Sequence, residues 1–331
     1  MIAPLKRREF ITLLGGAMAW PIAGRAQQPG MPVIGFLSNG FRQSDEAFRL
    51  PLLWQGLKEA GYVDGRNVAS QYRWAERQND RLEPLATDLV RQSVALIVAI
   101  GGLPPALAAK RVTTTIPIVF ITTGDPVRQG LVASLNQPRG NLTGVSGMAG
   151  VVVAKQLEVL HETVPSGALV GLLANPTNPN VEFYTRDAQE AAGALGLTLL
   201  VARAATERDL ESAFATLAEQ RVDVILVPSD SLFNDVPDQL VALAARHAIP
   251  AVYSLREFPR AGGLMSYGNS LADAYQPAGV QAGRILKGER PADLPVIQAT
   301  KIELIINLKT AKALGLAFPI TLLGRADEVI E

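Results

Sequence analysis

The side chains best suited to chemistry lie in five short polar segments, each directly after an expected buried strand. These segments are Ser38-Asn39-Gly40-Phe41, Gly101-Gly102, Thr122-Thr123-Gly124-Asp125, Asn175-Pro176-Thr177-Asn178-Pro179 and Ser229-Asp230-Ser231. In open α/β sheets ligands bind beyond the carboxyl ends of the strands, because helix N termini present unpaired N–H groups there. Amides, hydroxyls and bare glycine N–H groups in these positions predict a binding site for a small polar ligand.

Asp230 has the most specific chemistry among these residues. At the end of a strand it would supply the counter-charge that a ligand ammonium group needs, and helix capping is its structural alternative. Asp125 precedes Pro126, so turn initiation explains it as well as ligand contact does. Tyr184 lies one helical turn beyond the Asn-Pro segment. Tyr267 offers a ring face or a hydroxyl, unless it is a half-buried interface tyrosine.

Groups that catalysis usually needs are missing from the sequence. It has no cysteine, which excludes a thiolate nucleophile, a disulfide framework and Cys-ligated zinc. His161 and His247, its two histidines, fall late in expected helices, where a cation interacts with the helix dipole. The P-loop, Gly-x-Gly-x-x-Gly, Gly-x-Ser-x-Gly and His-Glu-x-x-His patterns do not occur. We therefore expect no catalytic residues, no metal ion and no cofactor.

Short apolar runs alternate with amphipathic segments through the first half of the chain. Strands are expected at 32–37, 68–74, 94–100 and 117–121, and helices at 45–61, 80–92 and 103–112. The run from Val94 to Ile100 is continuously apolar, which is typical of a strand covered on both faces. This βαβ repetition predicts a parallel sheet with helices on both sides.

The same alternation restarts near residue 169. Strands are expected at 169–174, 197–202, 224–227, 251–253, 264–267 and 296–306, and helices at 180–194, 206–220, 236–247 and 271–287. The segment 139–147 is rich in turn-forming residues and predicts the first crossing between the two halves. The fold class that follows is α/β, with two Rossmann-like lobes that each contain a parallel sheet.

The N-terminal residues predict export. Lys6-Arg7-Arg8 precedes a short apolar run, and Gly24-Arg25-Ala26 places small residues at −1 and −3 of a cleavage site. The apolar run is too short to span a bilayer core of about 30 Å. The pair Arg7-Arg8 fits twin-arginine export, and the general secretory route stays open. We expect a periplasmic protein cleaved after Ala26, which is not a lipoprotein because no cysteine is available for acylation.

Length and charge limit the class of protein further. Cleavage leaves 305 residues (331 minus 26), more than one hydrophobic core usually serves, so two domains are expected. Lys plus Arg and Asp plus Glu both number 31, which gives a net charge of zero. This balance offers no electrostatic basis for nucleic acid or for an anionic membrane surface as a partner. No later segment reaches about eighteen apolar residues, so no membrane insertion is expected.

Several longer motifs carry a resemblance to a known family. They are Lys-Arg-Arg-Glu-Phe-Ile-Thr-Leu-Leu-Gly-Gly-Ala (6–17), Thr-Thr-Ile-Pro-Ile-Val-Phe (114–120), Asp-Pro-Val (125–127), Arg-Gly-Asn-Leu-Thr-Gly (139–144), Ala-Gly-Gly-Leu-Met-Ser-Tyr-Gly (261–268) and the tail from Ile305 to Gly315 with 325–330. Over essentially its whole length the chain resembles ABC-transporter substrate-binding proteins of the TrpX-like family, long catalogued as a domain of unknown function.

The resemblance implies a type I periplasmic-binding fold with a three-strand hinge. It places the crossings near 143–147, 267–270 and 290–296, which returns the helix at 271–287 to the first lobe. The implied organisation is a signal peptide at 1–26, an N-terminal lobe at 31–145 plus 269–292, and a C-terminal lobe at 146–268 plus 293–331.

The resemblance also implies roles for some of the polar residues. Gly101-Gly102 and Thr122-Thr123 would hold a ligand carboxylate, and Asp230 would hold its ammonium group. Many relatives carry Thr-Asp-Asn where this chain has Ser229-Asp230-Ser231, so the aspartate is kept and the amide is lost. Phe41, Tyr184 and Phe233 are available to pack an aromatic or branched side chain, and core packing explains them equally.

The function expected from these observations is solute binding. The protein would capture an amino acid, aromatic or branched, or a related aromatic acid, by hinge closure, and deliver it as a monomer to an ABC permease and its ATPase. A periplasmic ligand sensor that signals to a membrane receptor, and an exported enzyme on a Rossmann-like scaffold, are the alternatives. A LacI-type repressor is discounted, because an export signal stands where its DNA-binding segment would be.

Overall fold

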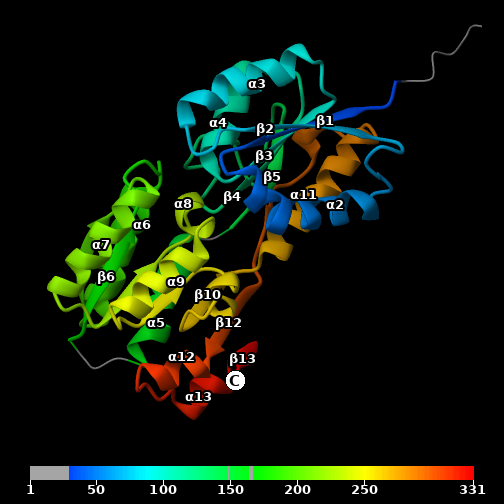
Figure 1. Ribbon diagram of the computed structural model, residues 1–331. Coiled ribbons are helices and arrows are strands. Elements are labelled where there is room, and N and C mark those ends of the chain that lie inside the picture. The colour runs from blue at the N-terminus through cyan, green and yellow to red at the C-terminus, as the bar shows by residue number, and fades with distance from the viewer. Residues whose placement is uncertain (1–29, 148, 164–166) are drawn as a thin grey trace, which may run out of the picture. The chain divides into compact units, whose positions relative to one another are not determined.

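The computed structural model describes residues 30–147, 149–163 and 167–331 (Figure 1). The expected signal peptide, residues 1–26, lies outside the described residues. The chain forms two β-sheets, of six and seven strands, which we call the first and the second sheet. In the part of the chain that the structure describes, no helix has both the length and the apolar character that crossing a membrane requires.

The first sheet is parallel throughout, in the order β11-β5-β4-β3-β1-β2. Every residue of β3, β4 and β5 is buried, because helices cover both faces of the sheet. All its strands run the same way, so the polar segments after β1, β3 and β4 meet at one edge. The strands are β1 (Val33–Ser38), β2 (Ala69–Trp74), β3 (Leu96–Ile100), β4 (Ile118–Thr122), β5 (Leu142–Ser146) and β11 (Ile297–Gln298).

Helices from both ends of the chain cover one face of the first sheet. Here α2 (Leu50–Glu59) packs against α11 (Leu271–Leu286), which Figure 1 shows in blue and orange. A short α1 (Arg42–Ser44) and a π-helical turn at Asp45–Arg49 lead into α2. The other face is covered by α3 (Leu82–Arg91) and α4 (Leu103–Val112).

The second sheet has the order β13-β12-β10-β9-β8-β6-β7 and is parallel except for the pair β10 and β12. One face packs on α5, α6, α12 and α13, and the other on α7, α8 and α9. The strands are β6 (Leu169–Ala174), β7 (Thr198–Arg203), β8 (Val224–Val227), β9 (Ala251–Tyr253), β10 (Met265–Asn269), β12 (Ile302–Asn307) and β13 (Glu328–Ile330). The helices are α5 (Ala149–His161), α6 (Val181–Ala194), α7 (Glu207–Glu219), α8 (Ser231–Asn234), α9 (Pro237–Arg246), α10 (Glu257–Arg260), α12 (Leu308–Ala313) and α13 (Ile320–Leu323).

The alternation of strands and helices expected from hydrophobic periodicity is confirmed, with two α/β sheets. The expected helix at 103–112 and the expected strands at 169–174, 224–227 and 251–253 have the expected bounds. Most other elements shift by one to three residues at their ends, as is normal where helix termini and strand ends are assigned.

Residues 139–147 end where the chain leaves the first sheet, as expected of the first crossing, but the strand within this segment was not expected. Residues 142–146 form β5, a fully buried strand of the first sheet that pairs with β4. Gly144 explains the omission, because a Cβ at that position would overlap the carbonyl oxygen of Phe120 on β4. A glycine that permits close approach of two strands therefore looked like a turn former.

The single strand expected at 296–306 is wrong. Ile297–Gln298 pairs with β5 in the first sheet, whereas Ile302–Asn307 pairs with β10 in the second. The chain passes from one sheet to the other at 299–301, beyond the expected 290–296, after earlier passages that follow β5 and β10. The lobe limits 31–145 plus 269–292 and 146–268 plus 293–331 stay a prediction.

Candidate functional site

A cavity of about 120 Å³ lies among the loops that follow the strands of both sheets. Its wall includes the segments after β1, β3 and β4 of the first sheet and those after β6 and β8 of the second. This is where helix N termini converge in open α/β sheets and where ligands bind. Among the described residues that line the cavity, only Arg49 and Asp230 carry charged side chains, while amides and hydroxyls are abundant.

Most of the polar residues singled out in the sequence come together at this cavity. Those that line it are Asn39, Gly101, Gly102, Thr122, Thr123, Asn175, Ser229 and Asp230. Within each sheet these residues lie at one edge because they follow parallel strands, and the cavity lies where the edges of the two sheets face each other. Their contact with a ligand stays a prediction.

Other predicted residues lie elsewhere. Asp125 and Tyr184 line an adjoining groove of about 810 Å³, which Thr123 and Ser229 also border. The Tyr184 hydroxyl accepts from Asn175 N at 3.2 Å, and burial raises the pKa of Tyr184 well above its usual value. Asp125 caps its own turn, since its Oδ1 accepts from Val127 N at 2.8 Å.

Three predicted residues line neither the cavity nor the groove. Ser38 is buried and its hydroxyl accepts from Gly40 N at 3.0 Å, which shapes the loop after β1. The Phe41 ring lies under the Arg77 guanidinium, 4.6 Å from ring centre to Cζ. Tyr267 borders a separate surface groove with Lys155.

The N terminus of α4 forms one part of the cavity wall. Gly101 and Gly102 have φ values of 93° and 100°, a backbone conformation that L side chains rarely adopt, and α4 begins at Leu103. Pro104 and Pro105 have no N–H, so the amides of the two glycines and of Leu103 are the donors available in this turn. The positive end of the helix dipole lies here as well and favours an anionic group.

Asp230 forms another part of the wall, on the second sheet. Its Oδ1 accepts from Asn175 Nδ2 at 3.0 Å and from Leu232 N at 2.7 Å, and its Oδ2 accepts from Asn178 Nδ2 at 2.5 Å. The bond to Leu232 makes it the N-cap of α8. Helix capping by Asp230 is therefore confirmed, and its contact with a ligand ammonium group from the cavity wall stays a prediction.

The charge of Asp230 has no counter-ion in the described part of the chain. The residue is only 3% exposed, and burial raises the pKa of its carboxyl above 3.8 although neighbouring side-chain and backbone groups donate hydrogen bonds to it. Hydrogen bonds from neutral amides compensate a buried carboxylate less than a cation does. A ligand that brings a positive group would complete this part of the cavity.

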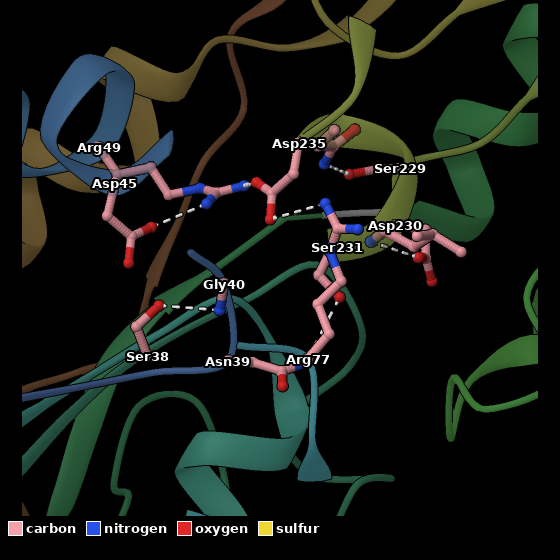
Figure 2. A network of polar contacts seen from close by, with 12 residues as sticks. Ser38, Asn39, Gly40, Asp45, Arg49, Arg77, Ser229, Asp230, Ser231 and Asp235 are labelled. Carbon is pink, nitrogen blue, oxygen red and sulfur yellow. Dashed lines mark hydrogen bonds and ion pairs between the residues drawn. The ribbon is translucent and has the colours of Figure 1, made fainter. Parts of the chain in front are cut away.

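Arg49, which the sequence analysis did not single out, lines the cavity and is 5% exposed. Its Nη1 donates to Asp45 Oδ1 and its Nη2 to Asp235 Oδ1, both at 2.8 Å (Figure 2). Asp45 precedes Arg49 by one helical turn, and Asp235 directly follows α8, a short helix that packs on the second sheet. In the sequence the pair Asp45 and Arg49 has the spacing of an ordinary surface ion pair, so no local signal marks it as buried.

Tyr275 is the aromatic residue that the described part of the cavity wall contains. It lies on α11, and burial raises the pKa of Tyr275 to about 12. By contrast, Phe233 is fully buried in the core of the second sheet. Sequence periodicity marks Tyr275 only as a core residue, because its position at the cavity depends on the return of α11 to the first sheet.

A further contact between the sheets lies beside the cavity. Gln129 Nε2, from the segment after β4, donates to Asn180 Oδ1 at the start of α6 with a distance of 2.9 Å.

Within residues 30–147, 149–163 and 167–331, no group of three His, Cys, Asp or Glu residues is placed to hold a metal ion. The arrangement offers ligand binding by hydrogen bonds and charge.

Comparisons with known proteins agree with these features. Residues 52–330 match the sequence model of a family described as ABC transporter substrate binding protein. A tyrosine-binding protein of Clostridioides difficile (strain R20291) is 28% identical over 262 residues, which cover 79% of this chain and 75% of that protein.

Two solved structures are similar over 90% of the chain. One is an ABC domain in complex with L-Trp from Streptococcus pneumonia, with 26% identity, a TM-score of 0.78 and 100% of that chain covered. The other is the ligand-free, open structure of a substrate-binding protein with adhesive properties from Clostridium difficile, with 25% identity, a TM-score of 0.65 and 99% covered. At nearly equal identity, the chain superposes better on the L-Trp complex.

Proposed function

Since this chain belongs to the family of ABC transporter substrate-binding proteins, we propose that it captures an amino acid in the cavity described above and delivers it to an ABC importer. The observation that carries the proposal is Asp230, a buried carboxylate on the wall of a polar cavity, with which no cation among the described residues pairs. A ligand ammonium group would pair with it through charge-assisted hydrogen bonds.

The two sheets supply complementary halves of an amino-acid site. Asp230 follows β8 of the second sheet and would bind the ammonium group, while the N terminus of α4 follows β3 of the first sheet and would bind the carboxylate. Thr122 and Thr123 add hydroxyls on the side of the first sheet. A ligand held from both sides would favour the closed arrangement of the sheets, which is how such a protein signals that it is loaded.

The side chain of the ligand is proposed to be aromatic or branched. Apolar atoms of Leu103, Ile121, Leu255 and Tyr275 line the cavity beside the polar groups. The tyrosine-binding relative and the L-Trp complex support this class of side chain.

We further propose that capture takes place in the periplasm, with a permease and its ATPase as partners and without a catalytic step.

A thermal-shift series with the purified protein tests this function. L-Tyrosine, L-tryptophan and L-leucine are compared with tyramine, which lacks the carboxylate, and with 3-(4-hydroxyphenyl)propionate, which lacks the ammonium group. A ligand at a hundred times its dissociation constant adds about 2.7 kcal/mol to the free energy of unfolding, so the melting temperature rises by several degrees. Stabilisation by an amino acid but by neither analogue is expected; stabilisation by sugars alone would contradict the proposal.

The affinity is also expected to depend on pH. Burial raises the pKa of Asp230 above 3.8 in the ligand-free protein, and a bound ammonium group would lower it again. Binding therefore releases a proton at acidic pH, and the affinity falls as the pH drops through the raised pKa. Calorimetric titration with L-tyrosine from pH 7 downward should show this loss beginning above pH 3.8. A constant affinity down to that pH would speak against Asp230 as the anchor.

A further inference from the structure

Five charged side chains link the two sheets beside the cavity. Arg49 Nη2 lies 2.8 Å from Asp235 Oδ1, Arg77 Nη2 lies 3.5 Å from Asp235 Oδ2, and Arg77 Nη1 also pairs with Glu207. Figure 2 shows Arg49 between Asp45 and Asp235, with Arg77 reaching Asp235 from the other side. We call this set the cross-sheet ion network; it consists of Asp45, Arg49, Arg77, Glu207 and Asp235.

The centre of the network is almost completely buried. The side chains of Asp45 and Asp235 are 0% exposed and that of Arg49 is 6% exposed. Removing such ions from water is costly, and only close pairing offsets that cost. The pair of Arg49 with Asp235 can form only while the segments packed on the two sheets are together, whereas the pair of Arg49 with Asp45 lies within the π-helical turn Asp45–Arg49. The cross-sheet pair is therefore coupled to the relative position of the sheets.

The loops that carry the network leave space for its side chains and hold an unusual backbone conformation. A Cβ at Gly40 would lie 3.1 Å from Arg49 Nη1 and 3.2 Å from Asp235 Oδ2, so glycine leaves room for this pair. Glu76 and Arg77 have φ values of 52° and 62°, a left-handed conformation that is costly for residues other than glycine. Arg77 N also donates to the carbonyl oxygen of Asn39 at 2.7 Å, which fixes the loop that carries its side chain.

We propose that the cross-sheet ion network is a latch that sets the equilibrium between open and closed arrangements, with Asp235 as the residue that both arginines engage. This inference rests on the proposed function, in which closure accompanies capture. The latch would hold a fraction of the ligand-free protein closed. Ligand affinity then depends on Asp235 through that fraction, in addition to direct contacts in the cavity.

The equilibrium can be measured without any ligand. The chain has no cysteine, so cysteines introduced at the exposed positions Asp80 and Arg208 take up two spin labels specifically. These positions flank Arg77 and Glu207 on opposite sides of the contact between the sheets. Pulsed electron paramagnetic resonance on the ligand-free protein then gives the populations of short and long distances.

Asp235→Asn is expected to lower the ratio of closed to open protein by about ten-fold or more, since it removes the charge that both arginines engage. Arg77→Gln should act in the same direction by a smaller factor. Glu303→Gln is the matched control, because Glu303 is a buried carboxylate that pairs with Arg256 inside the second sheet. It should leave the distances unchanged.

A double-variant cycle separates the latch from a general loss of structure. Arg49→Gln combined with Asp235→Asn is expected to change the ratio by less than the product of the two single effects, because both remove one interaction. Multiplicative effects, an unchanged distance distribution in Asp235→Asn, or a ligand-free parent protein with the long distance alone would each overturn the proposal. If no amino acid binds, the proposed function fails but this measurement still decides on the latch.

Discussion

Asp230→Asn is expected to weaken amino-acid binding by about a hundred-fold or more, which corresponds to about 2.7 kcal/mol of binding free energy. The carboxylate is buried, and no cation of the described residues pairs with it. A ligand ammonium group would therefore pair with the carboxylate in a site shielded from water, where a charge-assisted hydrogen bond is strong.

The same substitution is expected to leave the fold intact. Asparagine is as good an N-cap as aspartate, and its side-chain oxygen can still accept from Leu232 N and Asn175 Nδ2. The melting temperature of the ligand-free protein should change little, while the rise caused by L-tyrosine should disappear. This combination separates the loss of an anchor from the loss of a folded cavity.

Isothermal titration calorimetry with L-tyrosine measures the effect directly. Asp223→Asn is a suitable control, since Asp223 is an exposed carboxylate at the opposite ends of the strands of the second sheet, where it accepts from Leu169 N. It should bind like the unchanged protein. Equal affinities of the Asp230→Asn and Asp223→Asn variants would show that the ammonium group binds elsewhere.

Gly56→Ala is expected to destabilise the protein by about 3 kcal/mol, a large effect for a single methyl group. Gly56 lies in α2 where that helix contacts the backbone of α11. An added Cβ would overlap the carbonyl oxygen of Gln276 and lie 2.9 Å from Val280 N. Backbone atoms cannot rotate away as a flexible side chain can, so the two helices would have to separate.

Gly193→Ala is the matched control for this prediction. Gly193 lies in α6, is exposed, and has open space where its Cβ would be. Alanine there should stabilise the protein by about 0.5–1 kcal/mol, because it lowers the conformational entropy of the unfolded chain. Urea unfolding of both variants measures the two free energies. If Gly56→Ala also stabilised the protein, the close packing of α2 on α11 would be refuted.

The packing of these two helices also matters for the site. The turn that leads into α2 carries Arg49, and α11 carries Tyr275, both of which line the cavity. Separation of α2 from α11 would move both side chains. A weaker affinity of Gly56→Ala for L-tyrosine is therefore expected together with its lower stability.

Hydrophobic periodicity was sufficient to predict the two α/β sheets, because each buried strand is a short apolar run between amphipathic helices. Hydrophobic periodicity failed at two places, where a glycine permits close approach of two strands and where the chain changes from one sheet to the other. Gly144 allows β5 to approach β4 closely, and residues 299–301 carry the chain from one sheet to the other within the segment 296–306 that was expected to be one strand. Neither close approach nor a change of sheet has a periodic signature.

The polar wall of the cavity could be predicted for a topological reason. Parallel strands of one sheet end at the same edge, so the polar segments after Ser38, Ile100 and Thr122 gather at one edge of the first sheet, and those after Ala174 and Val227 at one edge of the second. The fold class and these two groups of polar segments follow from the sequence, whereas the meeting of the two groups at one cavity depends on how the sheets pack.

The compensation of each charge depends on tertiary packing. Asp45 and Arg49 look like a solvated pair in the sequence, yet burial and Asp235 from the second sheet make them part of a network that is buried at its centre. Asp230 is a helix cap, as its sequence position suggests, and burial without a partner cation among the described residues makes its carboxyl suited to a cationic ligand group as well. Burial and long-range pairing depend on how the whole chain packs. The local sequence therefore determines which charged side chains are present, and the packing determines the free energy of holding each charge in the folded protein.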